Sequence, residues 1–183
     1  DKRVKLIINK KSMGAGLSRN IGISKAKGKY LAFLDADDLW KKNKIETQLH
    51  FMIDNKLKIS HTSYEILKRN KTYNKVIKAK NFLDYKELLF SCDIGLSTVM
   101  MKKNLINDLC RFPNIKTKED FVLWLLILKR KIKIGALDKN LTTWRDLPNS
   151  LSSSITQKLK DGFYVYNYYM KFNIFKSLLY LLI

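Results

Sequence analysis

Apolar runs and helical patterns alternate along the first 40 residues. Residues 3–9 and 30–34 are short apolar runs, and the second has the continuous apolar character of a parallel strand covered on both faces. A turn over residues 12–16 leads into a helix that we expect over residues 17–27 and that Gly28 ends. An acidic segment follows the second strand. This order predicts an α/β fold in which helices cover a sheet.

The rest of the chain continues this pattern. A helix over residues 41–55 should turn one apolar face inward, made of Ile45, Leu49, Met52 and Ile53. Residues 118–131 are apolar nearly all round and are therefore expected as a buried helix. Further strands are expected at residues 59–67, 75–78, 96–101, 132–137 and 141–145, and short helices at residues 85–90, with Asp84 as N-cap, and 103–110. We expect a main domain over residues 1–152 and a helical, aromatic and basic extension over residues 153–183.

Composition adds a strong charge bias. The chain has 183 residues, which suits one domain, and carries 36 Lys and Arg against 16 Asp and Glu, a formal net charge of +20. An excess of this size indicates a polyanionic neighbour, such as nucleic acid, an anionic membrane or phosphorylated substrates. Abundant Lys, Ile and Asn are also what AT-rich coding produces, and on that alternative the charge has no functional meaning.

The cysteines, the histidines and the last apolar stretch limit which metal sites, compartments and membrane topologies the sequence can support. Cys92 and Cys110 form no disulfide framework and lie in no CxxC pattern, which argues against structural zinc and favours a cytoplasmic compartment. His50 and His61 do not have metal-ligand spacing. The apolar stretch over residues 177–183 is far shorter than the roughly 20 residues that span a bilayer.

Three carboxylates stand at the end of the second expected strand: Asp35, Asp37 and Asp38. Ligands bind at this edge in open α/β sheets. Carboxylates this close repel one another, so the cluster suits a divalent cation or the hydroxyls of a ligand. Asp-x-Asp in particular suits Mg²⁺ or Mn²⁺ that also bridges a diphosphate. The alternative is that one Asp caps the next helix and the others face solvent.

Three further residues are candidates for binding or catalysis. Arg19 follows a turn rich in small residues into a helix, where it could pair with a phosphate. Asp120 begins the buried helix, whose dipole would keep it ionised as a base at neutral pH. Arg145 lies near hydroxyls and amides that could hold a phosphate or sugar with it. Each has a plainer alternative: a capped surface helix for Arg19, helix capping for Asp120 and an ordinary loop for Arg145.

Taken in order, these segments resemble the family 2 glycosyltransferases with the GT-A fold. The resemblance runs from Asp1 to about Ser152. It depends chiefly on FLDADDLW at residues 33–40, followed about 80 residues later by EDFVLW at residues 119–124. The supporting segments are GLSRN at 16–20, AKGKY at 26–30, KIETQ at 44–48 and STVM at 97–100.

The resemblance implies a GT-A-like mixed, mostly parallel sheet flanked by helices. It implies an inverting transfer of a sugar from a nucleotide diphosphate, with a UDP-sugar as the expected donor. Asp37 would hold Mn²⁺ or Mg²⁺, Asp35 would lie near the ribose or the metal shell, and Asp120 would take the proton from the acceptor hydroxyl. The metal and an Arg would stabilise the departing diphosphate. The additional binding residues expected are Arg19, Asp38 and Arg145.

Three departures from the family pattern bear on these expectations. The family opens with a Pro-x-Tyr-Asn-like turn and an Asp-Asp-Gly-Ser-like segment that grip the nucleotide, and roughly 35–60 residues holding them are missing from this sequence. The fold is thus expected to be N-terminally truncated, as a piece of a longer protein or a truncated reading frame. Pro148, Asn149 and Ser150 stand where the family often has a metal-binding His. The absence of QxxRW favours the addition of single sugars.

The basic charge has a function in this setting. Residues 40–80 and the aromatic tail suggest peripheral docking at the anionic inner face of the cell membrane, with a glycan or lipid-linked acceptor of bacterial surface polysaccharide or lipooligosaccharide synthesis. The alternative for the tail is packing on the sheet. Two other hypotheses stay open for the chain: an inactive glycosyltransferase remnant, and a basic module that binds nucleic acid or an anionic membrane. No nucleic-acid-binding signature is present, and we expect no nucleic acid partner.

Overall fold

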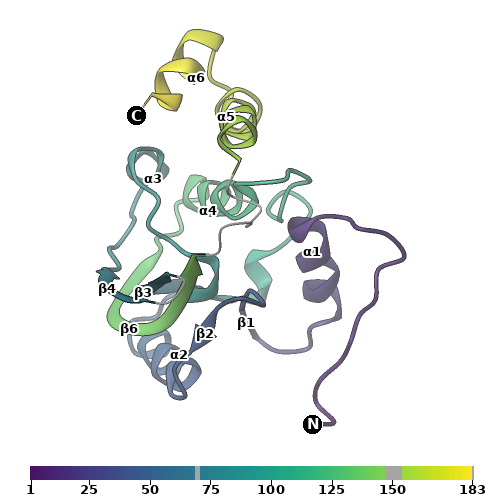
Figure 1. The fold of residues 1–183 in the computed structure, drawn as a ribbon, viewed down its shortest axis with the longest axis vertical. Coiled ribbons are helices and arrows are strands. Elements are labelled where there is room, and N and C mark those ends of the chain that lie inside the picture. The colour runs from purple at the N-terminus through teal and green to yellow at the C-terminus, as the bar shows by residue number, and fades with distance from the viewer. Residues whose placement is uncertain (69–70, 147–153, 183) are drawn as a thin grey trace.

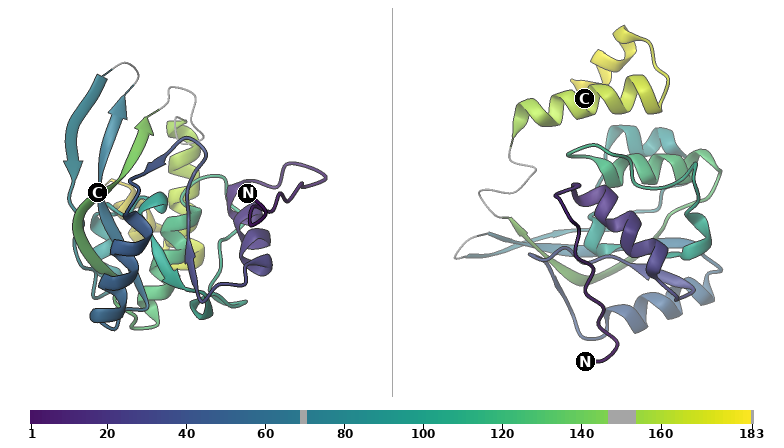
Figure 2. Two further views of the ribbon diagram at one scale, coloured as in Figure 1. Left: turned by 90° about the horizontal axis from the view of Figure 1, so that it is seen from below. Right: turned by 90° about the vertical axis from the view of Figure 1, so that its right-hand side faces the viewer.

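The computed structural model describes residues 1–68, 71–146 and 154–182. A twisted sheet separates helix α2 on one face from helices α1, α3 and α4 on the other, and α5 and α6 lie farther out, beyond α4 (Figures 1 and 2). The helices are α1 (Ala15–Lys25), α2 (Lys44–Asp54), α3 (Tyr85–Phe90), α4 (Glu119–Lys129), α5 (Ile155–Tyr164) and α6 (Ile174–Leu181). This layered arrangement confirms the predicted α/β class.

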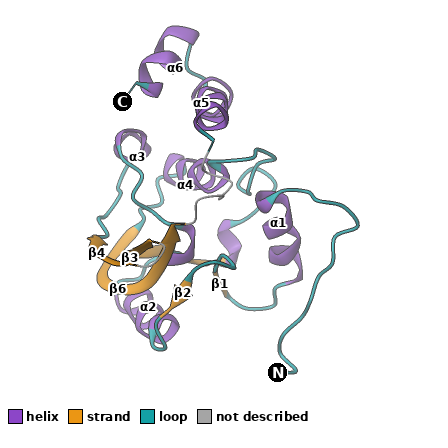
Figure 3. Ribbon diagram, viewed as in Figure 1, coloured by secondary structure: helices purple, strands orange, loops and turns teal. Residues whose placement is uncertain are grey.

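The sheet has six strands, drawn in orange in Figure 3. They are β1 (Tyr30–Ala32), β2 (Leu39–Trp40), β3 (Ile59–Lys68), β4 (Lys71–Ile77), β5 (Met100–Lys102) and β6 (Gly135–Asp146). The order is β1-β5-β3-β6-β2, and β4 also pairs with β3. Among the described strands only β3 and β6 are parallel, joined by the long crossover through α3 and α4 that a parallel pair needs. The expected mixed sheet is confirmed, but a mostly parallel sheet is wrong for these strands.

Helix α4 forms the centre of the core, as predicted. All but one of the residues 121–128 are buried, and Trp124 has no exposed surface. The Trp124 ring lies 6.5 Å from the Phe112 ring, which packs in turn against Phe33 beside β1. The short helix α3 is also as predicted, with Asp84 Oδ1 accepting from Lys86 N at 2.7 Å.

The strand predicted over residues 3–9 does not form. This segment pairs with no described strand, and its apolar side chains are solvent-exposed, to 83% for Leu6 and 81% for Ile8. An apolar run becomes a strand only where a neighbouring strand satisfies its backbone hydrogen bonds. The next run is shorter than predicted and forms β1, which pairs antiparallel with β5 rather than in a parallel sheet, and Leu34 beyond it is 48% exposed.

Helix α2 is rotated relative to its predicted orientation. Met52 faces the sheet as expected, but Ile45 and Ile53 are exposed and Lys44 and Gln48 are fully buried instead. The sheet face under this helix is polar, and the Gln48 amide satisfies it by donating to the carbonyl oxygens of residues 60 and 98 at 3.1 and 3.0 Å. The hydrogen bonds of Gln48 therefore decide which face of α2 packs on the sheet, and burial of Ile45 and Ile53 does not.

Several element boundaries also differ from the predictions. One long strand, β6, replaces the two strands expected between residues 132 and 145. The strand expected at 96–101 is a 3₁₀ turn followed by β5, and the helix expected at 103–110 is a single 3₁₀ turn over Lys103–Leu105. Gly95 and Lys102 are the residues just before these two turns, and both have an extended backbone conformation.

The C-terminal extension is helical as predicted, with a π-helical turn, Val165–Tyr169, between α5 and α6. Its aromatic side chains pack on α3 and α4 rather than on the sheet. The ring centre of Tyr166 lies 6.4 Å from that of Phe121, and the ring centre of Tyr180 lies 5.6 Å from that of Phe90. The predicted boundary at residue 152 and Pro148–Ser150 lie outside the described residues. None of the described helices combines the length and apolarity needed to span a membrane.

Candidate active site

A cavity of about 520 Å³ opens between the loop after β1, the start of α4 and the end of β6. The loop over residues 35–38 is called the acidic loop below. The cavity is lined by all six residues predicted for binding or catalysis: Arg19, Asp35, Asp37, Asp38, Asp120 and Arg145. Residues from opposite ends of the main domain therefore meet in one place.

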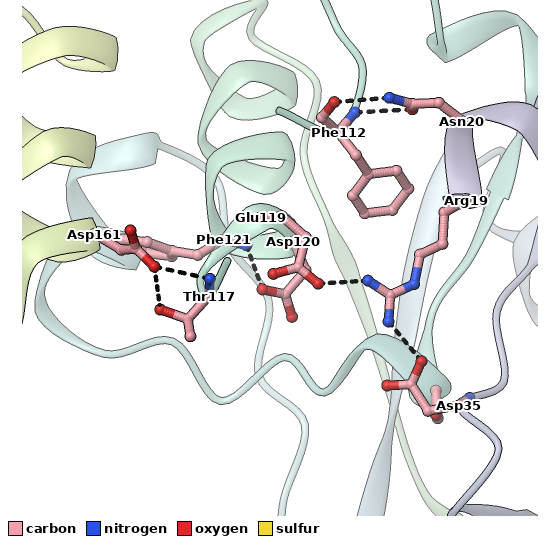
Figure 4. A network of polar contacts seen from close by, with 10 residues as sticks. Arg19, Asn20, Asp35, Phe112, Thr117, Glu119, Asp120, Phe121 and Asp161 are labelled. Carbon is pink, nitrogen blue, oxygen red and sulfur yellow. Dashed lines mark hydrogen bonds and ion pairs between the residues drawn. The ribbon is translucent and has the colours of Figure 1, made fainter. Parts of the chain in front are cut away.

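Arg19 bridges two acidic walls of this cavity. Its Nη2 lies 2.6 Å from Asp35 Oδ1 and its Nη1 lies 2.5 Å from Glu119 Oε1 (Figure 4). Burial alone would lower the pKa of Arg19, but Asp35 and Glu119 together raise it above its ordinary value. The side chain is 19% exposed and paired with two carboxylates, so Arg19 is not a freely solvated residue of a surface helix. A phosphate contact for Arg19 stays a prediction.

The GLSRN motif of α1 holds Arg19 over the cavity. Asn20 Nδ2 donates to Phe112 O at 2.8 Å, and Asn20 Oδ1 accepts from Phe112 N at 3.2 Å (Figure 4). Gly16 packs against the segment before α4, where a Cβ on Gly16 would lie 2.7 Å from Pro113 O. Real Cβ atoms do not approach backbone this closely, so glycine permits the tight packing of α1.

The end of β6 holds the acidic loop in a tight turn. Asp38 N donates to Asp35 O at 3.0 Å, and Asp38 Oδ1 accepts from Arg145 N at 3.1 Å. Arg145 Nε donates to the carbonyl of Asp37. Burial raises the pKa of Asp38, although its hydrogen bonds with Ser97 and Arg145 oppose this rise. Arg145 lies in a strand and organises the acidic loop, so the ordinary-loop alternative for Arg145 is wrong.

The segment after the acidic loop anchors it to the sheet. Asn43 is the N-cap of α2, so no residue of the acidic loop caps this helix, contrary to the capping alternative. Trp40 Nε1 donates to Ser97 O at 2.6 Å, and Ser97 Oγ accepts from Asp35 N at 3.1 Å. The fully buried Lys44 places its Nζ 4.1 Å from the centre of the Trp40 ring, and burial lowers the pKa of Lys44 to about 7.

Asp120 faces the cavity from the first turn of α4. Its Oδ1 accepts from Phe121 N at 2.7 Å. Burial, and next the charge of Glu119, raise the pKa of Asp120 to about 6, against the opposing effects of the Phe121 N–H and Arg19. The helix-dipole argument would give Asp120 a lowered pKa, but the net effect of its surroundings is to raise this pKa. At pH 7 about nine in ten Asp120 carboxylates are still ionised, and a base with a pKa near the working pH is well matched to proton transfer.

The acidic loop fits a hard divalent cation. Asp35 gives one oxygen to Arg19, while no hydrogen bond or ion pair with a described residue engages the Asp37 carboxylate. Within the described ranges, no three or more His, Cys, Asp or Glu side chains are grouped closely enough to hold a metal ion. Mg²⁺ is often held by one or two carboxylates, with substrate phosphates and water as its other ligands. Asp37 and Asp35 fit that mode.

Several cavity residues were not singled out in the sequence. Tyr64 on β3 and Trp144 on β6 line the cavity with ring centres 6.5 Å apart, edge to face. Glu119, the second partner of Arg19, stands next to Asp120 and could have been found by asking which residue neutralises Arg19. Ser97 begins the STVM segment of the resemblance, but the segment does not show that Ser97 contacts residues about 60 positions away.

Comparisons with a family model and with known proteins point to the same family. The chain matches the family described as Glycosyl transferase family 2 over residues 1–112. It is 33% identical over 178 residues to TuaG of Bacillus subtilis, named as a glycosyltransferase of teichuronic acid biosynthesis, and the match covers 97% of this chain and 70% of TuaG. It is 36% identical over 162 residues to WfgD of Escherichia coli, named as a UDP-Glc:alpha-D-GlcNAc-diphosphoundecaprenol beta-1,3-glucosyltransferase, covering 87% of this chain and 62% of WfgD.

The fold is similar to a solved structure. It matches S. aureus TarS, residues 1–349 in complex with UDP-GlcNAc, with a TM-score of 0.65 and 15% identity, covering 95% of this chain and 52% of that one. At this identity the similarity concerns the fold alone, and it supports the predicted GT-A-like architecture. The chain thus spans about half the length of the TarS chain.

Proposed function

This chain belongs to glycosyltransferase family 2, and we propose that it moves one sugar from a nucleotide-diphosphate sugar, with UDP as the expected nucleotide, to a glycan or lipid-linked acceptor. The observation that carries this proposal is the cavity in which the acidic loop, Arg145 and Asp120 meet. The names of TuaG and WfgD support an acceptor in bacterial surface polysaccharide or lipooligosaccharide synthesis.

Asp120 is the proposed base of this reaction. Its carboxylate takes the proton from an acceptor hydroxyl while the hydroxyl oxygen attacks the anomeric carbon. The bond between that carbon and the diphosphate oxygen breaks with its electron pair on the diphosphate, and the configuration inverts. The pKa of about 6 supports this role, because the carboxylate is ionised at pH 7 yet more basic than an ordinary Asp.

Arg145 and Arg19 are proposed to act on the donor side. The Arg145 side chain lines the cavity and is oriented by its Nε contact with the acidic loop, so its positive charge can stabilise the departing diphosphate. Arg19 already pairs with Asp35 and Glu119, so its main proposed effect is to hold these two walls at a fixed separation. Asp38 contributes by fixing the Arg145 backbone.

Mn²⁺ or Mg²⁺ is the proposed cofactor. Asp37 would hold it, with Asp35 beside it, and the bound ion would supply Lewis-acid stabilisation of charge on the departing diphosphate. The Asp37 carboxylate lines the cavity and has no hydrogen-bond or ion-pair partner among the described residues, which supports this assignment. For a lipid-linked acceptor, the enzyme would act from the cytoplasm, in peripheral contact with the inner face of the cell membrane.

The test is a calorimetric titration of UDP into the chain with and without Mn²⁺, with Asp37→Asn as the variant. Asp54→Asn, an exposed carboxylate at the end of α2, is the matched control. We expect binding that requires Mn²⁺, that weakens at least about tenfold in Asp37→Asn, and that Asp54→Asn leaves unchanged.

The other outcomes separate the alternatives. Failure of the folded chain to bind UDP in Mn²⁺ would contradict the proposal and favour an inactive remnant. Binding of nucleic acid that falls with salt and is indifferent to Asp37→Asn would favour a basic binding module.

A further inference from the structure

Helix α6 packs one face on the rest of the molecule and exposes an apolar face. Its inner face holds Ser177, which is fully buried, and Tyr180, whose ring packs against Phe90. Its outer face exposes five large apolar side chains: Ile174 (60%), Phe175 (85%), Leu178 (48%), Leu179 (56%) and Leu182 (86%). Large apolar patches are rarely left exposed to water unless they bind a partner or a membrane. Within the described part of the chain, nothing covers this outer face.

The exposed charges of the segment that carries this face are all positive. Between residues 154 and 182 the basic side chains are Lys158, Lys160, Lys171 and Lys176, all exposed. Asp161, the one acidic residue of this segment, is 8% exposed, and its Oδ2 accepts from Thr117 N and Thr117 Oγ1, both at 2.8 Å. The segment therefore offers an anionic partner four lysines and no exposed carboxylate.

The same contact ties the extension to the candidate active site. Thr117 lines the cavity three residues before Asp120, and Asp161 on α5 fixes Thr117 (Figure 4). Figure 1 shows α5 and α6 at the end of the molecule farthest from the sheet, with α4 between them and the strands. A surface that binds α6 would therefore lie on the same side of the sheet as α4, whose first turn carries Asp120.

We propose that the outer face of α6 binds an anionic lipid bilayer, with Phe175 and Leu182 inserted at the boundary of headgroups and acyl chains and the positive charge of the same segment attracting the lipid phosphates. Such in-plane binding combines buried apolar area with electrostatic attraction. A second copy of the chain would cover the apolar face but would bring like charges together, which disfavours a symmetric dimer. The proposal extends the proposed function, because a bilayer is where a lipid-linked acceptor resides.

The test measures binding of the chain to sedimented vesicles of phosphatidylcholine alone or with about one third phosphatidylglycerol. The apolar variant is Phe175→Ser with Leu182→Ser, and its control is Leu109→Ser, which is 88% exposed in another part of the chain. We expect binding to the anionic vesicles that weakens about 10- to 100-fold in the apolar variant and is unchanged in the control.

A charge variant tests the second component. Lys158→Gln with Lys160→Gln should weaken binding about tenfold, whereas Lys10→Gln with Lys11→Gln should not. UDP affinity should stay the same in every variant, so a failed donor site is separated from a failed membrane surface. No binding to anionic vesicles, or equal binding of wild type and apolar variant, would overturn the proposal. So would a wild-type dimer that the apolar variant converts to monomer without any vesicle binding.

Discussion

The acidic loop and the start of α4 present carboxylates to the same cavity from surroundings that differ. In the acidic loop, Asp35 is 38% exposed and paired with Arg19, and Asp37 is half-buried beside the cavity. At the start of α4, Glu119 takes the second arm of Arg19, and Asp120, also half-buried, has no cation paired with it among the described residues and a pKa raised to about 6 by desolvation and by the charge of Glu119. One residue type thus serves two purposes. The acidic loop can receive a cation and a diphosphate, and the start of α4 holds a base poised near neutrality.

The largest expected effect is on catalysis by Asp120 at the start of α4. Asn in place of Asp120 keeps the shape and can still accept from Phe121 N, but it cannot take a proton. We expect Asp120→Asn to lower kcat for sugar transfer by about 10²- to 10⁴-fold, with UDP affinity little changed. Asp108→Asn, at a side chain 97% exposed on the surface, should leave both quantities unchanged. An Asp120→Asn enzyme with near wild-type kcat would remove the base from α4.

The next effect concerns the bridge between the walls. Arg19→Met leaves Glu119, which is 9% exposed, without its cation, and an unpaired charge of this kind costs about 1–3 kcal/mol of unfolding free energy. Activity should fall about 10- to 100-fold because the two walls lose their fixed spacing. Urea unfolding and steady-state kinetics measure the two effects.

Arg19→Lys separates charge from geometry. An ammonium keeps the positive charge but cannot reach two carboxylates with two nitrogens of one planar group. We expect it to recover only part of the stability and activity. A fully active Arg19→Lys enzyme would contradict a bridging role.

The elements that the sequence predicts well are those whose cause is local. Asp84 caps α3 as expected because its side chain meets a backbone N–H two residues away. Helix α4 is correct because an unbroken apolar helix has only the core to occupy. Predictions fail where distant partners decide. The run at residues 3–9 finds no strand to pair with, and α2 turns Gln48 inward because the sheet opposite it is polar.

The candidate site divides in the same way. The acidic loop and Asp120 could be found because motifs place them at a strand end and a helix start. Their electrostatics could not, because the pKa of Asp120 depends on burial by the folded chain and on Arg19, about 100 positions away. The burial of Lys44 is the feature that the sequence hides most completely. A Lys at the start of a helix is expected to face water, but Lys44 is buried against the Trp40 ring.

A smaller effect tests the packing that holds the bridge in place. Gly16→Ala puts a Cβ 2.7 Å from Pro113 O, so α1 must move away from the start of α4. We expect a loss of about 1–3 kcal/mol in unfolding free energy and a few-fold loss of activity. Gly22→Ala on the same helix meets no atom within 4 Å and should gain up to about 1 kcal/mol from helix propensity. Equal stabilities of the two variants would show that α1 is not packed this tightly.

The smallest effect is a shift in pH dependence. Because Asp120 must be ionised to act as a base, kcat/KM should be constant above its pKa of about 6 and fall about tenfold per pH unit below it. The charge of Glu119 raises this pKa, so Glu119→Gln should move the acid limb toward lower pH. Glu46→Gln, at an exposed position in the first turn of α2, should leave the limb in place. An acid limb that stays near pH 6 in Glu119→Gln would contradict the assignment, because it would mean that the charge of Glu119 does not raise the pKa of the base.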